Sequence, residues 1–216
     1  MKIDKWMIVG ISAVIIGAGF WTAKYFYKAE EVAAVESVAK EEPAVFVRPH
    51  SPRMGNANSK VTVVEFLDPE CESCRAVYPE VKKIIQEFDV QLVVRYAPYH
   101  HNSVFAVKIL HAAMKQNKYW ETLGVLFESQ PEWGSHHAPQ PEKIWDHLPK
   151  AGVNVEQIRS EMNDPATFDL IELDKEDGAK LGVNGTPTFF VNGKPLENLG
   201  MDYLRQAIKT EVEATK

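Results

Sequence analysis

The residues best suited to chemistry are two cysteines, the only two among 216 residues, in the order Cys71-Glu72-Ser73-Cys74. A disulfide between them would close a very small loop and restrain the unfolded chain weakly, so the spacing suits chemistry better than architecture. A thiolate on Cys71 can attack a disulfide of another molecule, and Cys74 can then resolve the mixed disulfide. The alternative is half of a metal site, because thiolates also bind Cu(I) and Zn(II).

A carboxylate lies upstream of the cysteines, inside an apolar segment. Glu65 is six residues before Cys71, within residues 61–67, whose β-branched and apolar composition predicts a buried strand. Burial would raise the pKa of Glu65, which suits a proton acceptor for Cys74 during resolution. The alternative is that Glu65 faces solvent on an edge strand.

The segments around the cysteines predict a strand–helix–strand unit. Apolar residues in 77–88 recur on one helical face, and residues 90–96 predict a second strand. Cys71 therefore lies at the start of a helix, where unpaired N–H groups and the helix dipole stabilise an anion. Both effects would lower the pKa of Cys71. Pro79 falls inside the helix and predicts a kink there.

The rest of the chain predicts helices followed by a small β-unit. Strand character returns at residues 188–191, before an Asn192-Gly193 hairpin turn and a partner strand at 195–199. Thr186-Pro187, just ahead of this strand, suggests a cis peptide bond or a turn. A last helix follows residue 200. The helices expected between the two β-units cover residues 103–116, 118–129, 141–150, 155–162 and 166–181.

Four segments in this order resemble one family, the DsbA-like branch of the thioredoxin-fold thiol–disulfide oxidoreductases. They are VVEFLDPECESC (63–74), Pro79, KYWETLGVLFESQPEW (118–133) and GTPTFFVNG (185–193). The resemblance extends over about residues 55–210. It implies an α/β thioredoxin-like fold, in the order β-α-β, a helical insertion at about 103–181, and β-β-α, within a domain of residues 55–216.

The resemblance also implies roles for individual residues. Cys71 would be the exposed nucleophile and Cys74 the buried resolving thiol, with Glu65 as the buried acid. Pro187 would be a cis-proline facing the disulfide, and Thr186 would offer backbone groups to an extended substrate peptide. The implied activity is disulfide exchange with cysteine-containing proteins and with a redox partner protein, using no cofactor beyond the chain's own dithiol.

The chain departs from the family between the cysteines. Strongly oxidising members have Pro-His there, whereas this chain has Glu72 and Ser73. Negative charge at Glu72, together with Asp68 and Glu70, should disfavour the Cys71 thiolate and make the disulfide less oxidising. The direction of exchange (oxidase, isomerase or reductase) therefore stays open.

A rival function from another class uses the same thiols. His100 and His101 follow the second predicted strand, and either could join Cys71 and Cys74 around an ion. The chain would then be a periplasmic copper- or zinc-binding thioredoxin-like module. We favour the oxidoreductase, with no metal site, because adjacent histidines usually lie in solvated loops.

The N-terminus predicts a membrane anchor. Residues 6–23 form eighteen consecutive uncharged positions with lysines on both sides, which is just long enough to span the hydrocarbon core. A cleaved secretory signal is the alternative, but the aromatic stretch after this run makes a poor cleavage site. We expect a transmembrane helix within residues 1–28 and a linker over residues 29–54.

Charge separates the anchor from the rest of the chain. Residues 1–28 carry four Lys and one Asp, a net charge of +3, and the whole chain carries −6, which leaves −9 for residues 29–216. This asymmetry favours a single-pass protein of the cytoplasmic membrane whose catalytic domain lies in the periplasm or another extracytoplasmic space. The acidic balance argues against nucleic-acid binding, which needs a basic surface.

Overall fold

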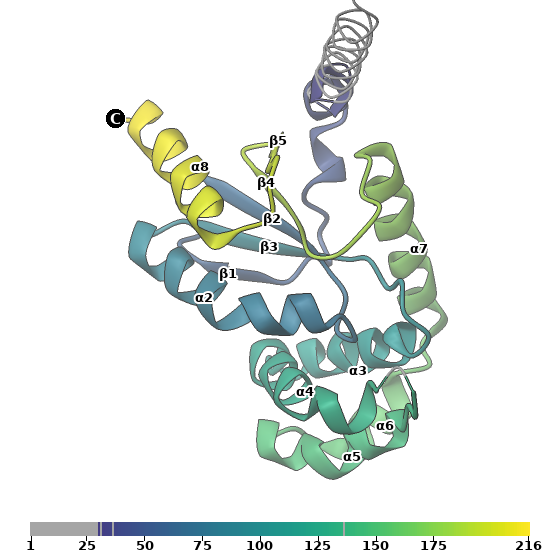
Figure 1. The fold of residues 1–216 in the computed structure, drawn as a ribbon. Helices are drawn as coiled ribbons and strands as arrows, with labels where there is room; N and C mark the ends of the chain where they lie inside the picture. Colours follow the sequence, from purple (N-terminus) through teal and green to yellow (C-terminus); the bar gives the residue numbers. More distant parts are fainter. Residues whose placement is uncertain (1–29, 31, 36, 136) are drawn as a thin grey trace, which may run out of the picture.

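The computed structural model describes residues 30–216 apart from 31, 36 and 136 (Figure 1). Among these residues, no helix combines the length and the apolar character that crossing a membrane requires. The transmembrane segment expected at residues 6–23 lies outside the described part of the chain.

A five-stranded sheet in the order β1-β3-β2-β4-β5 forms the centre of the domain. β2 is parallel to β3 and antiparallel to β4, so the strand that leads to the cysteines has a partner on each side. The strands are β1 (Arg53–Gly55), β2 (Thr62–Leu67), β3 (Gln91–Tyr96), β4 (Thr188–Val191) and β5 (Lys194–Pro195). The strands predicted from residues 61–67, 90–96 and 188–191 are confirmed. β5 is shorter than expected and starts earlier.

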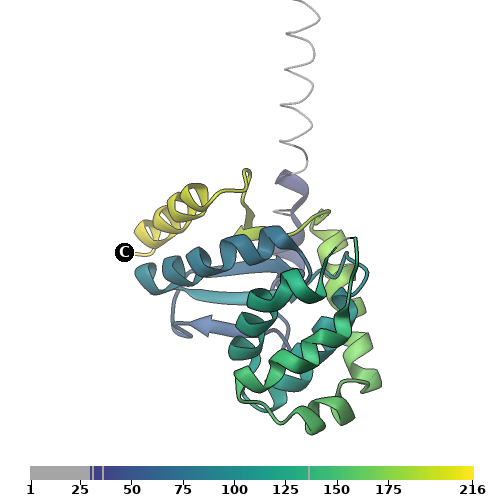
Figure 2. The same ribbon diagram turned by 60° about the horizontal axis from the view of Figure 1, so that its bottom comes forward.

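Helices cover both faces of the sheet, and a helical insertion extends from one end (Figures 1 and 2). α2 and α8 pack together on one face, whereas α7 packs against β3 on the other. The helices are α2 (Glu72–Phe88), α3 (Ser103–Lys115), α4 (Tyr119–Trp133), α5 (Ile144–His147), α6 (Val155–Glu161), α7 (Pro165–Lys180) and α8 (Met201–Ala214). Short 3-10 turns are η1 (Pro43–Val45), η2 (Pro141–Lys143) and η3 (Leu148–Ala151). The order confirms the thioredoxin-like α/β fold.

The two sheet faces bury separate apolar clusters. Val63 and Leu67 of β2 belong to the cluster under α2, whereas Val64 and Phe66 belong to the cluster on the opposite face. Successive side chains of a strand point to opposite faces, so Glu65 lies on the α2 side, with Val63 and Leu67. The strand sequence therefore directs Glu65 toward the helix that carries the cysteines.

Part of the segment expected to be a linker packs on the domain instead. Val45 and Phe46 are buried, and the rings of Phe46 and Phe190 meet edge to face with centroids 5.2 Å apart. Arg53–Gly55, where the sequence predicted no strand, pairs with β3 as strand β1. Apolar side chains in an otherwise acidic stretch explain this difference, because they gain by leaving water.

A buried ion network holds the same segment to the domain. Arg95 of β3 is fully buried and contacts Asp174 and Asp177 of α7 at 2.6 and 2.7 Å. Asp177 also accepts two hydrogen bonds from Arg48, each 2.8 Å long. His50 Nε2 lies 2.7 Å from Asp174 Oδ1. The charges compensate one another, as burial of ionised groups requires.

Candidate active site

Cys71 and Cys74 lie where the carboxyl end of β2 meets the start of α2. Cys71 is the N-cap of α2, and Cys74 is in its first turn. Both thiols are free; Cys71 is 7% exposed, whereas Cys74 is fully buried. Of the two sulfurs, Cys71 is therefore the one that another molecule can reach.

The loop before β4 faces the first cysteine. The Thr186–Pro187 peptide bond is cis, as the sequence suggested. Because β4 runs antiparallel to β2, with Thr188 opposite Phe66, this loop arrives beside the cysteines. The Cys71 sulfur lies 3.3 Å from the carbonyl oxygen of Thr186, to which its protonated form donates a hydrogen bond. The structure thus brings Cys71, Thr186 and Pro187 together.

The environment separates the proton affinities of the two thiols. The pKa of Cys71 is lowered to about 5, chiefly by a hydrogen bond from Cys74; burial opposes this shift, and the Thr186 side chain and the N–H groups of Ser73 and Cys74 assist it. Burial raises the pKa of Cys74, and the hydrogen bond to Cys71 and the charge of Glu65 raise it further. At neutral pH the pair holds a thiolate on Cys71 and a proton on Cys74.

This result corrects the expectation that nearby carboxylates leave the Cys71 thiolate disfavoured. The hydrogen bonds to Cys71 outweigh burial, which is the effect that opposes the lowered pKa. The residues between the cysteines act unequally. Ser73 contributes its backbone N–H to Cys71, whereas Glu72 is exposed on the first turn of α2.

Glu65 is buried beneath the cysteine pair. It is 1% exposed, and neither carboxylate oxygen has a hydrogen-bond partner among the described residues. Burial, and then the charge on Cys71, raise the pKa of Glu65 to about 8. The edge-strand alternative is wrong, because β2 has β3 on one side and β4 on the other.

The two acids before Cys71 bind the loop between β3 and α3. Asp68 is fully buried and accepts hydrogen bonds from the backbone N–H groups of Glu70 and Tyr99, both 2.8 Å long. It also accepts from His100 N over 3.1 Å, and His100 Nδ1 lies 2.7 Å from it. Glu70 accepts from Asn102 N and Asn102 Nδ2 over 2.6 and 2.8 Å. These carboxylates therefore fix one wall of the site.

Gln130 of α4 is a supporting residue that the sequence did not single out. Its Nε2 donates to the carbonyl oxygens of Pro69 and Cys71 over 2.9 and 3.1 Å. These bonds hold the turn that carries the nucleophile. Gln130 lies in the stretch 118–133, which contributed to the family resemblance. Nothing in that stretch indicated that its side chain contacts the turn before α2.

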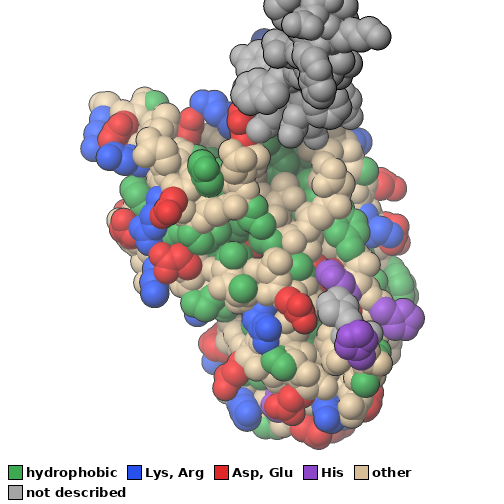
Figure 3. Space-filling model, viewed as in Figure 1, with side chains coloured by type: hydrophobic (Ala, Val, Ile, Leu, Met, Phe, Trp, Pro, Cys, Tyr) green, Lys and Arg blue, Asp and Glu red, His purple; other side chains and the backbone are tan. Residues whose placement is uncertain are grey.

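Two pockets lie beside elements that form the site, one next to α2 and one next to the loop before β4. A polar one of about 390 Å³ lies between α2 and the end of α4 and is lined by Glu72, Arg75, Gln130 and His137, among others. Figure 3 shows histidine side chains gathered at the surface near the junction of sheet and insertion. Among the described residues, no group of three or more His, Cys, Asp or Glu side chains is placed to hold a metal ion.

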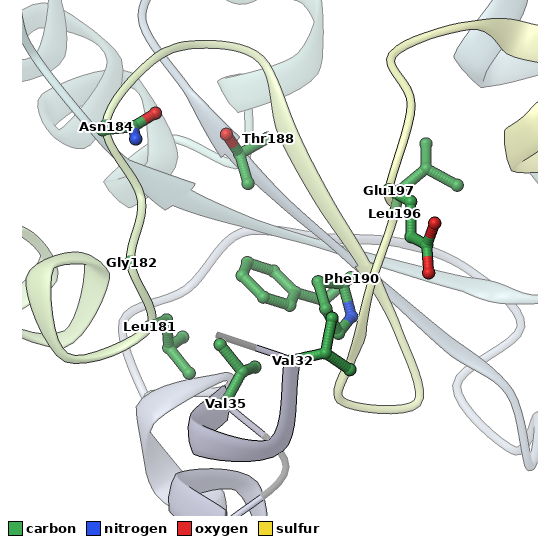
Figure 4. Close-up of a pocket in the computed structure, with 10 residues that line it drawn as sticks. Val32, Val35, Leu181, Gly182, Asn184, Thr188, Phe190, Leu196 and Glu197 are labelled. Carbon is green, nitrogen blue, oxygen red and sulfur yellow. The ribbon is translucent and has the colours of Figure 1, made fainter. Parts of the chain in front are cut away.

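The second pocket, of about 250 Å³, lies beside the loop that contains the cis peptide bond (Figure 4). Asn184 and Thr188 line it on either side of that loop's centre. Val35, Leu181 and Phe190 give it an apolar wall. Val35 belongs to the segment expected to be a linker, so that segment helps to shape the surface beside the loop before β4.

Comparisons with known proteins agree with this geometry. The thioredoxin family matches residues 48–210. A solved structure of a thioredoxin-like oxidoreductase from Silicibacter pomeroyi DSS-3 is 28% identical, with a TM-score of 0.69 over 80% of this chain and 98% of that one. The disulfide bond formation protein D of Bacillus subtilis is 26% identical over 173 residues, which are 75% of this chain and 77% of that protein.

A further relative is much longer than this chain. The Na(+)/H(+) antiporter NhaA of Herminiimonas arsenicoxydans is 27% identical over 180 residues, which are 81% of this chain but 28% of the antiporter. The chain thus spans less than a third of that relative's length. Since the family match covers more than half of the chain, we conclude that the chain belongs to the thioredoxin family and to its DsbA-like branch.

Proposed function

We propose that the chain is a thiol–disulfide oxidoreductase that exchanges disulfides with cysteine-containing proteins. One observation carries the proposal: Cys71 and Cys74 hold opposite protonation states at neutral pH, next to the Thr186 carbonyl oxygen. A thiolate at the surface and a protonated thiol behind it are what a two-step exchange requires. The name of the Bacillus subtilis relative agrees with this chemistry.

The reaction moves two electrons between two disulfides. In the reducing direction, the Cys71 thiolate attacks a substrate disulfide, forms a mixed disulfide and releases one substrate thiolate. Cys74 then loses its proton and attacks the Cys71 sulfur, which releases the second substrate thiolate and leaves a Cys71–Cys74 disulfide. In the oxidising direction, a substrate thiolate attacks the Cys71–Cys74 disulfide and the same steps run backwards.

Glu65 serves as the proton acceptor for Cys74. Its charge is among the causes that raise the pKa of Cys74, and its own pKa of about 8 lies close to physiological pH. A base with such a pKa can take the proton in one direction and return it in the other. Because Glu65 and Cys74 are both buried, the proton would pass between them without first entering the solvent.

Electron flow from substrate thiols to the Cys71–Cys74 disulfide is the favoured direction. Lowering the pKa of Cys71 to about 5 stabilises the reduced pair, because that pair carries the thiolate. A stabilised reduced form makes the corresponding disulfide a stronger oxidant. The Cys71–Cys74 disulfide then has to be regenerated by a redox partner protein that accepts the electrons.

Substrates bind as extended peptides beside the loop at Thr186. Its carbonyl oxygen already lies within hydrogen-bond distance of Cys71, so a peptide whose sulfur replaces that contact would lie next to the loop backbone. The neighbouring apolar pocket would take a side chain of the same peptide.

The setting of the enzyme follows from the sequence. Residues 6–23 would hold it in the cytoplasmic membrane, with the domain on the extracytoplasmic side, where disulfides persist. The match to the antiporter gives no ground for assigning ion transport to this chain, since it covers 28% of that protein.

Trapping of substrates tests the proposal. In the full chain, Cys74→Ala should accumulate mixed disulfides through Cys71 that dissolve on reduction, because the resolving thiol is gone. Cys71→Ala is the matched control and should trap none. Absence of adducts from Cys74→Ala in an oxidising compartment would contradict the proposed function.

A further inference from the structure

Acidic residues flank Cys71 on both sides in the sequence. Asp68 and Glu70 precede it and Glu72 follows it, and Asp68 is fully buried. The backbone N–H of Cys71 donates to the carbonyl oxygen of Asp68 over 3.1 Å. Asp68 and Cys71 are therefore joined in one turn, and the carboxylate of Asp68 belongs to that turn. An uncompensated buried carboxylate at this place would oppose a thiolate on Cys71, because screening is weak where water is excluded.

Among the described residues, the imidazole of His100 meets that carboxylate directly. His100 Nδ1 lies 2.7 Å from Asp68 Oδ2, and the backbone N–H of His100 donates to the same oxygen. The loop that carries His100 is fixed in turn, because Glu70 accepts hydrogen bonds from Asn102 and Ser103. The imidazole therefore has a set position, with 29% of its side chain exposed.

Among the described residues, the negative groups that act on His100 lie in the β2–α2 turn and at the cap of α2. Burial disfavours the imidazolium, but Asp68, Cys71 and Glu70 favour it, and the pKa of His100 is raised. The presence of Cys71 among these groups places the imidazole within electrostatic reach of the thiolate. The distance of 2.7 Å between His100 Nδ1 and Asp68 Oδ2, and the full burial of Asp68, also place the imidazole where it can compensate this carboxylate.

We propose that His100 is a positioning residue for the nucleophile: its imidazolium neutralises the buried Asp68 carboxylate and so supports the thiolate of Cys71. The inference rests on the proposed function and specifies what tunes that site. His100 supplies from the β3–α3 loop a positive charge that Glu72 and Ser73, between the cysteines, cannot supply. It acts through Asp68 and transfers no proton to substrate.

The test compares three variants of the full chain with the unchanged protein. His100→Gln removes the charge and keeps a polar side chain, His100→Lys keeps a charge, and His101→Gln is the matched control at the exposed neighbouring position. The readouts are the pH dependence of thiolate absorbance, which follows Cys71, and the equilibrium of the disulfide with glutathione.

We expect His100→Gln to lower the thiolate fraction of Cys71 about threefold on the acidic side of its titration. The equilibrium constant with glutathione should change by the same factor, so that the disulfide becomes a weaker oxidant. A threefold change corresponds to a reduction potential lower by about 14 mV for two electrons. His100→Lys should restore most of the change, and His101→Gln should cause none. A loss that His100→Lys does not restore, or an equal loss in His101→Gln, would overturn the inference.

A reciprocal measurement avoids any folding defect of the His100 variants. Coupling between two titrating groups is mutual, so removing the thiolate must lower the pKa of His100, which means that its acid dissociation constant rises by the same factor of about three. Cys71→Ser and the unchanged chain, compared by NMR titration of the imidazole, give this shift; an unchanged His100 titration would overturn the inference. A Cys71 that titrates like an ordinary thiol in the unchanged chain would instead contradict the proposed function itself.

Discussion

The sulfur of Cys71 lies 3.3 Å from the carbonyl oxygen of Thr186, 115 residues further along the chain. Neither the helix that carries Cys71 nor the loop that carries Thr186 forms this contact alone, because it depends on β4 pairing with β2. The sheet register thus places a reactive thiol beside backbone that can bind a peptide.

The low pKa of Cys71 predicts its reactivity with alkylating agents. The rate with iodoacetamide should rise through pH 5 and level off below neutrality, because the pKa of Cys71 is about 5. Cys74→Ala should move the midpoint upward, since the hydrogen bond from Cys74 is the largest cause of the shift. A midpoint at an ordinary thiol's pKa of about 8.5 in the unchanged chain would contradict the site described here.

Glu65→Gln should slow resolution of mixed disulfides. The variant keeps the shape of the protonated acid but cannot accept a proton, so the release step should fall by about 10²-fold or more at pH 7. Single-turnover reaction with a disulfide-bonded peptide measures this step separately from the initial attack by Cys71. Glu128→Gln, an exposed change on α4, serves as the control. Equal release rates in the two variants would remove Glu65 from the mechanism.

The same residue predicts how stability depends on pH. Glu65 has a folded-state pKa of about 8, against an ordinary value of 4.5, so the unfolded chain releases its proton first as the pH rises. Its contribution to stability is fully present below about pH 4.5 and is lost progressively up to about pH 8. Glu65→Gln should therefore match the unchanged chain at pH 4.5 and exceed it by on the order of 3 kcal/mol at pH 7. Urea unfolding of the reduced proteins at both pH values measures this; a constant difference would contradict it.

Asp174→Asn should destabilise the domain strongly. Asp174 accepts from Arg95 and from the backbone N–H of Tyr96, and the change leaves a buried guanidinium with weaker compensation. Loss of one partner from a buried ion pair costs roughly 3–5 kcal/mol. Asp169→Asn, an exposed change on the same helix, should cost less than about 0.5 kcal/mol. Denaturant unfolding at pH 7 compares the two, and equal losses would show that the network adds little.

Gln130→Leu should loosen the turn before α2. Two buried carbonyl oxygens, those of Pro69 and Cys71, would lose their donor, at a cost of about 1–3 kcal/mol. Hydrogen exchange at the amides of residues 70–74 should then quicken, while exchange in β3 stays unchanged. Protection that persists in residues 70–74 would show that water replaces the side chain without loss.

Local patterns in the sequence predicted the elements that carry the site. The β-branched run of β2 and the apolar period of α2 are long enough to be recognised, and both place Cys71 at a helix start. β1 was missed because it has three residues and its only support is pairing with β3. The contact of Asp68 with His100 joins residues that are 32 positions apart. No local pattern reports such a contact, because the path of the β3–α3 loop decides it.

The chain before β1 has a mechanical consequence. Phe46 packs on Phe190 and Arg48 forms an ion pair with Asp177. These contacts fix the segment before β1 to the sheet and to α7. A force applied to the chain at residue 30 would act on these contacts before it acted on the turn that carries Cys71. Because these contacts hold the segment to the sheet and to α7, a force applied to the chain before them acts on the whole domain and not on the active site alone.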